Sequence, residues 1–366
     1  MNSPTVLHIS PFSSVTQQHG GWQRTRQVRR LLETENCQVV SCPVHEQNLN
    51  RFEKLAALLE SCSRYHIPPA ARLWSQRHRA YTYARARRWF RQQHSRGVRV
   101  LVYEHSILLN PVLAHAAAAE NMAVFGIPHN MESIAAQKAN PFTSAKGLRF
   151  LREELQLFRK MKHVFCISRE ETWLMNCLGI EAAYLPYYPP DDDLQALQTV
   201  RSHRSNGTEK SYLVFGTADN PTTHKGVLAL DRLLVESPVP EDCRLLLAGY
   251  NTEKFRDRLK SPVWQIIGTV PSEDLGNLMQ DVAALLVFQK SGSGALTRIP
   301  RSLISGIPVL ANSMAARNYY DHEGVYVFDT AQGLRKLLQQ DLPTPPVPAR
   351  NTFCERNFLD CVRREI

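Results

Sequence analysis

Short, mostly apolar runs recur along the chain, and each is followed by a segment with helical spacing. Runs of this kind are typical of strands that are buried on both faces of a parallel sheet. They span residues 5–9, 98–103, 122–127, 163–167 and 182–185, and then 212–216, 245–249, 264–267, 283–288 and 308–311. Strands that alternate with helices in this way predict the α/β class and doubly wound parallel sheets.

A polar segment interrupts the alternation near the middle of the chain. Pro189 and Pro190 are followed by three aspartates and then by polar residues up to Ser211, a composition typical of a loop. A chain of 366 residues is long enough for two cores. We therefore expect a first domain over 1–190, a linker over 191–211, a second domain over 212–345 and a terminal helix over 346–366.

A glycine-containing stretch between two of these strands carries the clearest chemical signal. Gly292 and Gly294 follow the strand at 283–288, and the apolar spacing after them predicts a helix over 297–305. The free N–H groups and the dipole of a helix start favour an anion, and Thr297 and Arg298 add a hydroxyl and a guanidinium. We interpret the stretch as a phosphate-binding loop; the alternative is a turn whose glycines serve packing alone.

The expected helix is followed by Gly306-Ile307-Pro308-Val309-Leu310-Ala311. This segment resembles the nucleotide-sugar site of the retaining GT-B glycosyltransferases of group 1, which are family 4-like. The family pattern is Glu-Gly-Phe-Gly-Leu, a helix with a second glutamate, and then Gly-Val-Pro-Val-Ile-Ala. The two glutamates fall on Ser293 and Arg301, so both carboxylates are absent here. The resemblance implies two Rossmann-like domains that face a cleft, with the terminal helix packed back on the first domain.

The resemblance also implies roles for residues elsewhere in the chain. Lys225, followed by Gly226 at an expected helix start, is similar to the family's donor-diphosphate lysine. Arg298 replaces the charge of an arginine that the family places where Thr217 stands. His129, in a Pro-His-Asn segment, resembles a histidine that lies close to the transferred sugar.

Paired glycines between the first strand and the first helix complete the set. Gly20 and Gly21 resemble the acceptor-side loop of GT-B enzymes, which approaches the donor diphosphate. A Rossmann dinucleotide site is the competing interpretation, but residues 19–26 lack its G-x-G-x-x-G pattern. The expected catalytic residues are thus Lys225, Arg298 and His129, and the expected donor-binding residues are Gly20, Gly21, Gly292, Ser293, Gly294, Thr297 and Arg301.

The implied activity is hexosyl transfer from a nucleotide-diphosphate sugar to an acceptor hydroxyl, with retention of configuration. The implied acceptor is a glycan or a lipid-linked molecule in cell-surface glycan or glycolipid synthesis. The missing glutamates leave two alternatives open, namely an inactive GT-B binding or scaffold protein and an epimerase-like GT-B enzyme. We expect no metal and no cofactor besides the donor, because Asp191 to Asp193 stand in what reads as a solvated loop.

Polar residues at the ends of the expected strands are further candidates. Ligands of doubly wound sheets bind beyond the carboxyl ends of the strands. Glu104 and His105 follow one strand, His129 to Glu132 follow the next, and Ser168 to Glu170 follow a third.

The formal charge of +10 is concentrated in one segment, since residues 71–99 contain nine arginines interleaved with aromatic residues. We expect a long helix there that binds an anionic membrane surface, and the alternative is a solvated helix that covers the sheet.

No nucleic-acid-binding module is visible, so we expect no nucleic-acid partner. We expect no signal peptide and no membrane span, and the eight cysteines lack C-x-x-C spacing. These features favour a cytoplasmic protein that is peripheral on the inner face of the membrane.

Overall fold

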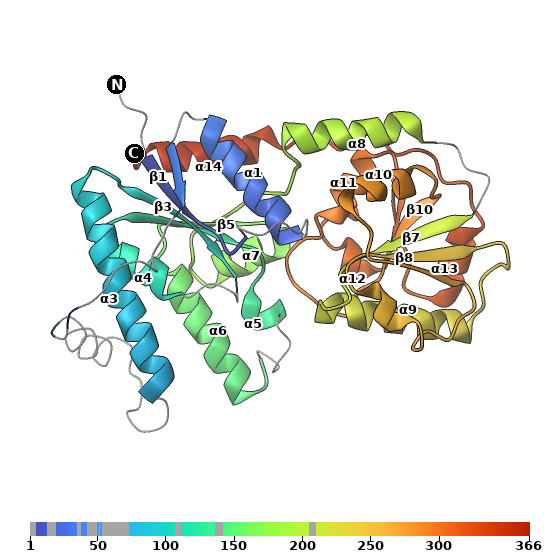
Figure 1. Ribbon diagram of the computed structural model, residues 1–366, viewed down its shortest axis with the longest axis horizontal. Helices are drawn as coiled ribbons and strands as arrows, with labels where there is room; N and C mark the ends of the chain where they lie inside the picture. The colour runs from blue at the N-terminus through green and yellow to red at the C-terminus, as the bar shows by residue number, and fades with distance from the viewer. Residues whose placement is uncertain are drawn as a thin grey trace. The chain divides into compact units, whose positions relative to one another are not determined.

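The computed structural model describes residues 5–12, 20–34, 38–41, 50, 52, 73–106, 111–135, 142–204 and 210–366. The chain forms two compact units. The first comprises Met1–Val15, Val28–Pro186 and Thr352–Ile366, and the second comprises Thr16–Gln27 and Tyr187–Asn351. Each unit contains one six-stranded parallel sheet with helices on both of its faces (Figure 1). The predicted α/β class and the two doubly wound sheets are therefore confirmed.

The sheet of the first unit has the order β2-β1-β3-β4-β5-β6. Its strands are β1 (Thr5–Ile9), β2 (Gln38–Ser41), β3 (Val100–His105), β4 (Ala123–Pro128), β5 (His163–Cys166) and β6 (Ala182–Tyr184). The helices are α1 (Gly20–Thr34), α3 (Leu73–Ser95), α4 (Val112–Ala119), α5 (Glu132–Ala135), α6 (Ala145–Phe158), α7 (Arg169–Cys177) and α14 (Thr352–Arg363). Only the part of α1 from Val28 onward belongs to this unit.

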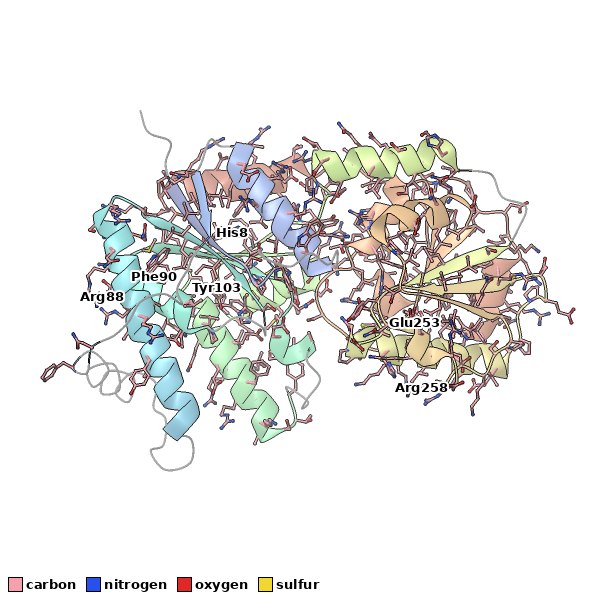
Figure 2. The ribbon with its side chains drawn as sticks, viewed as in Figure 1. His8, Arg88, Phe90, Tyr103, Glu253 and Arg258 are labelled. Carbon is pink, nitrogen blue, oxygen red and sulfur yellow. The ribbon has the colours of Figure 1, made fainter. Side chains whose placement is uncertain are left out.

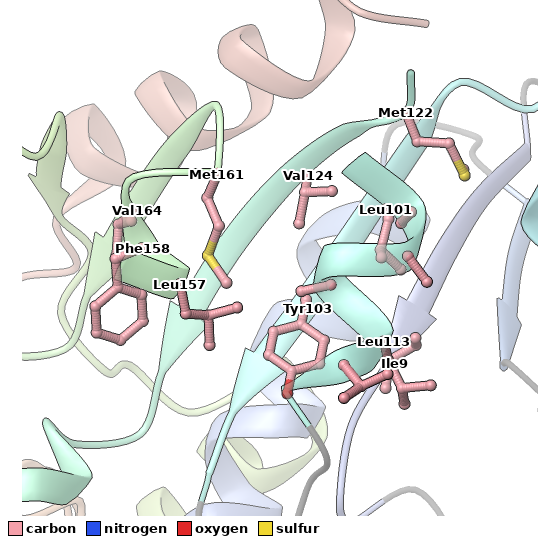
Figure 3. Close-up of a cluster of buried hydrophobic side chains, with 14 of the residues drawn as sticks. Ile9, Leu101, Tyr103, Leu113, Met122, Val124, Leu157, Phe158, Met161 and Val164 are labelled. Atoms are coloured by element: carbon pink, nitrogen blue, oxygen red, sulfur yellow. The ribbon is translucent and has the colours of Figure 1, made fainter. Parts of the chain in front are cut away.

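Two apolar layers enclose this sheet. Side chains of α3, α4 and α6 form the layer on one face, where Tyr103 and Phe158 are fully buried (Figure 3). On the other face, α1 and α14 cover the sheet, and the Phe358 ring meets the Phe165 ring with centroids 5.0 Å apart. Apolar residues on both faces explain why these strands lack an alternating pattern.

The arginine-rich helix α3 turns its aromatic side chains inward. Tyr83, Trp89 and Phe90 are buried in the core, whereas Arg88 is exposed on the outer side of the helix (Figure 2). Arg87 and Arg91 form ion pairs with Glu120 at 2.6 and 2.9 Å. The described part of α3 is thus a helix that covers the sheet, and its binding to a membrane stays a prediction. Residues 71 and 72 lie outside the described residues.

The sheet of the second unit has the order β12-β11-β10-β7-β8-β9. Its strands are β7 (Ser211–Phe215), β8 (Arg244–Ala248), β9 (Trp264–Gly268), β10 (Ala284–Val287), β11 (Val309–Ala311) and β12 (Val325–Val327). The α-helices are α8 (Asp191–His203), α9 (Pro221–Glu236), α10 (Ser272–Gln280), α11 (Arg298–Ile304), α12 (Ser313–Ala316) and α13 (Ala331–Leu338). A short 3₁₀ helix spans Thr252–Phe255.

Asp191 to Asp193 do not stand in a solvated loop, as the sequence suggested, but form the first turn of α8. Carboxylates are favoured in a first helical turn by the helix dipole, and a preceding proline suits a helix start. At the other end of α8, the Arg201 guanidinium donates to the carbonyl oxygens of Leu303 and Ile304. The helix is therefore part of the second unit, where it holds the end of α11.

Replacing Phe358 with alanine should destabilise the first unit by about 3–5 kcal/mol, because the buried ring leaves a cavity against Phe165. The matched control is Phe353→Ala on the same helix, where the side chain is 79% exposed and the cost should stay below about 0.5 kcal/mol. Thermal or urea unfolding of both variants measures the difference. Equal destabilisation by the two would contradict the described packing of α14.

Candidate functional site

Each sheet has one point where the order of its strands reverses direction. In the second unit the chain proceeds from β7 to β8 and β9 on one side, and β10 then lies on the other side of β7. In the first unit β2 and β3 lie on opposite sides of β1. A crevice beyond the carboxyl ends of the strands at such a switch point is where doubly wound sheets bind ligands. The two switch points are therefore the places to inspect.

Arg298 lies at the switch point of the second unit. Its Nη1 donates to the carbonyl oxygen of Phe215, the last residue of β7, at 2.5 Å. A Cβ on the next residue, Gly216, would lie 2.8 Å from the same nitrogen, so glycine permits this close approach. Burial lowers the pKa of the Arg298 guanidinium to about 10, which leaves it positively charged at neutral pH. Its Nε–H is buried and has no hydrogen-bond partner within the described part of the chain.

The glycine loop that precedes Arg298 accepts hydrogen bonds from side chains of the segment that follows α12. Gly292 and Gly294 adopt φ values of +147° and +70°, which favour glycine. The Gly294 carbonyl accepts from Arg317 Nη2 at 2.6 Å and from Asn318 Nδ2 at 3.1 Å. Arg317 Nη1 also donates to Gln289, which follows β10, at 3.1 Å. Ser293 is half-buried in this loop. The sequence analysis missed Arg317 and Asn318, which no motif marked.

Thr297 directly precedes α11, which begins one residue after the expected helix start, and its side chain makes no capping hydrogen bond. A Cβ on Gly20 would be 3.0 Å from the Thr297 hydroxyl, and both residues belong to the second unit. Gly20 and Gly21 form the first turn of α1 instead of a loop. The structure thus brings together Gly20, Thr297 and the glycine loop.

Lys225 is placed differently from the sequence expectation. Helix α9 begins at Pro221, so Lys225 is an exposed residue of its second turn and does not start the helix. The Asn220 side chain accepts from the backbone N–H groups of Thr222 and Thr223, which therefore do not face an anion. Gly226 serves packing, since a Cβ there would lie 2.2 Å from the Phe288 carbonyl oxygen. Lys225 remains a candidate through its side chain alone.

Arg301 points toward α8. Its Nη1 lies 3.3 Å from Asp193, whose other oxygen lies 2.7 Å from Arg26 Nη1. All three residues belong to the second unit. A carboxylate from α8 therefore lies next to the position at which the family that this sequence resembles has its second glutamate.

The switch point of the first unit is built around one buried carboxylate. Glu104, at the end of β3, accepts from His8 Nε2 at 2.7 Å, from His129 Nε2 at 2.8 Å and from the Ser10 hydroxyl at 2.8 Å. Burial by itself would raise the pKa of the Glu104 carboxyl, but hydrogen bonds from His129 and His8 outweigh it and hold that pKa well below its usual range. Because an ionised carboxylate only accepts, both imidazoles must carry a proton on Nε2.

A second buried carboxylate fixes the segment that carries His129. Glu154 of α6 accepts from His105 Nε2 at 2.9 Å and from the backbone N–H groups of Glu132 and Ser133 at 2.7 and 3.1 Å. The Glu171 side chain accepts from the Met131 N–H at 2.8 Å. The strand-end pattern had indicated Glu104, His105 and His129, but not His8, Glu154 or Glu171. A histidine inside the apolar run Thr-Val-Leu-His-Ile was the available signal for His8.

Among the described residues, no cluster of three or more His, Cys, Asp or Glu side chains could hold a metal ion. No helix there has both the length and the apolar character that a membrane span requires.

Solved structures similar to this chain along its whole length include glycosyltransferases. Sucrose-phosphate synthase from Thermosynechococcus elongatus aligns with a TM-score of 0.59 and 12% identity, over 99% of this chain and 98% of that one. Trehalose 6-phosphate synthase from Burkholderia multivorans aligns with a TM-score of 0.57 and 13% identity, over 100% and 95%. HepE from Anabaena, solved with UDP and glucose, aligns with a TM-score of 0.56 and 11% identity, over 99% and 100%. No family model and no curated protein matches the sequence. The chain thus has the GT-B fold of these enzymes.

Replacing Glu104 with glutamine should lower stability at neutral pH by roughly 2–3 kcal/mol, because two imidazole N–H donors lose an ionised acceptor. The folded-state pKa of Glu104 is depressed, so its stabilising contribution is present above the unfolded pKa of about 4.3 and is lost as the pH falls further. The difference between the melting temperatures of the two proteins should therefore begin to shrink as the pH falls below about 4.3. A gap that stays constant down to pH 3 would argue against an ionised Glu104. The control is Glu181→Gln, which removes the exposed pair with His163.

Proposed function

We propose that this protein transfers a hexosyl group from a nucleotide-diphosphate sugar to an acceptor hydroxyl, with retention of configuration. The observation that carries the proposal is the position of Arg298 at the carboxyl end of β7, beside a glycine loop at the switch point. A diphosphate oxygen at this place would accept from the Arg298 Nε–H, which is buried and lacks a partner within the described residues. Anions are favoured there for electrostatic reasons as well, since the guanidinium stays charged.

The chemistry requires little covalent help from the protein. The bond between the sugar C1 and the diphosphate oxygen breaks, its electron pair leaves with the diphosphate, and the acceptor oxygen bonds to C1 as its proton passes to an oxygen of the leaving diphosphate. Negative charge therefore grows on the leaving diphosphate, and preorganised positive charge stabilises that change most. Arg298, the exposed Lys225 and the amides of Gly292 to Gly294 are the groups that we assign to it. Ser293 and Thr297 add hydroxyl groups beside them.

The first unit supplies the groups that we assign to sugar hydroxyls. Glu104 fixes the orientation of the His129 ring through Nε2. The Glu154 and Glu171 carboxylates hold the backbone of the same segment. A histidine positioned from two sides in this way suits a hydroxyl ligand better than a solvated loop residue does.

The donor that deserves the first test is a UDP-sugar, because HepE from Anabaena was solved with UDP and glucose. The acceptor that we propose is a glycan or a lipid-linked molecule of cell-surface synthesis. The loss of both family glutamates favours one alternative, an inactive GT-B protein that binds a nucleotide sugar without transferring it. Product analysis after incubation with a panel of nucleotide sugars and acceptors separates the two.

Arg298→Gln and Lys225→Ala should each slow turnover about a hundredfold, since one preorganised donor is worth roughly 3 kcal/mol at a developing charge. The control is Arg335→Gln, which removes an exposed cation from the last turn of α13. Turnover at saturating donor and binding of UDP by calorimetry are the measurements. Unchanged turnover in Lys225→Ala would remove that residue from the mechanism, and unchanged turnover in Arg298→Gln would remove the basis of the proposal.

Turnover should not depend on a divalent cation. In this proposal the cationic side chains neutralise the charge of the diphosphate, which is the usual role of such a cation. Activity after dialysis against EDTA should match that of the untreated enzyme and should not rise with added manganese. Loss of activity in EDTA that manganese restores would overturn this assignment.

A further inference from the structure

The amino-terminal end of α6 exposes two large apolar side chains to solvent. Phe142 lies just ahead of the helix and is 59% exposed, and Leu148 in the first turns is 48% exposed. The helix start is well formed, because the Ser144 hydroxyl accepts from the Gly147 N–H at 3.0 Å. At the other end of α6, Leu155, Leu157 and Phe158 are buried in the core. The helix is thus anchored at one end and presents apolar groups at the other.

Cationic side chains surround this end of α6. Lys146, Arg149 and Arg152 are all exposed. The exposed acid in this part of the helix is Glu153, and it lies 3.9 Å from Arg149, which makes a weak pair. Exposed apolar groups next to cations on one helix end are the combination by which helices bind the surface of an anionic bilayer.

Two other exposed aromatic residues of the first unit lack this combination. Trp173 is 69% exposed, and the charged residues that precede it on α7 include the acid Glu170 as well as Arg169. Phe353 is 79% exposed on α14, which carries acids as well as arginines. The described aromatic side chains of α3 at Tyr83, Trp89 and Phe90 are buried. The end of α6 thus combines exposed apolar and cationic side chains, which these buried aromatic residues of α3 do not offer.

We propose that the amino-terminal end of α6 docks the protein on an anionic lipid bilayer. Phe142 and Leu148 enter the boundary between headgroups and acyl chains, while Lys146, Arg149 and Arg152 bind headgroup phosphates. The net charge of +10 draws the whole chain toward the same surface. The proposal does not depend on the activity of the site.

Flotation of the full-length protein with vesicles of phosphatidylglycerol and phosphatidylcholine at low salt tests the proposal. Replacing Lys146, Arg149 and Arg152 with glutamine should weaken binding about fivefold per cation, on the order of a hundredfold in all. Phe142→Ser with Leu148→Ser should weaken it by about tenfold or more, also at low salt. All of these side chains are exposed, so circular dichroism should show unchanged folding.

Two control variants separate α6 from the alternatives. Trp173→Ser with Phe353→Ser removes exposed aromatic surface of the same unit, and Arg88→Gln removes an exposed cation of α3; both should bind as the wild type does. Wild-type protein that does not float with anionic vesicles would overturn the proposal. It would also be overturned if either control weakened binding as much as the α6 variants do.

Discussion

Parallel hydrogen bonding is the constraint on which the rest of this structure depends. When every strand of a sheet runs the same way, each connection must cross back over a face, so helices cover both faces and the strands become apolar throughout. All carboxyl ends then meet at one edge. Where the order of the strands reverses, neighbouring connections leave on opposite faces and a crevice opens between them. The position of the candidate groups follows from this topology, and their chemistry follows from the residues found there.

The two switch points are chemically different. In the second unit, the groups at the edge are cationic, with Arg298 on the Phe215 carbonyl and Arg317 on the glycine loop. In the first unit, a buried carboxylate holds two imidazoles and a hydroxyl. Buried charges of this kind are costly unless partners surround them, so their presence argues for a role beyond packing. A phosphate-bearing donor suits the cationic switch point of the second unit. Hydroxyl groups suit the switch point of the first unit.

The sequence was sufficient for the central strands and for two of the four outermost ones. The two strands that it missed, β2 and β12, lie at the edges of their sheets. An edge strand pairs on one side only and is less covered, so it needs no unbroken apolar run. Helix α8 was missed for another reason, since Pro-Pro-Asp-Asp-Asp is as typical of a loop as of a helix start. Tertiary contacts, such as the hydrogen bond from Arg201 to the Leu303 carbonyl of α11, decide between them.

Site residues were predictable from the sequence where a local backbone conformation requires a particular residue type. They were not predictable where side chains from distant segments of the chain come together. Gly292 and Gly294 have the positive φ angles that their place in the sequence indicated. The partners of Glu104 come from β1 and from the segment after β4, which no local pattern connects. The position of Arg301 illustrates the same limit. In the sequence, Arg301 replaces a carboxylate of the family pattern with a positive charge. In the folded unit, the Arg301 guanidinium is paired with Asp193, so a carboxylate from α8 lies close to that position. The loss of a motif residue is therefore weaker evidence against a nucleotide-sugar site than the sequence alone implied.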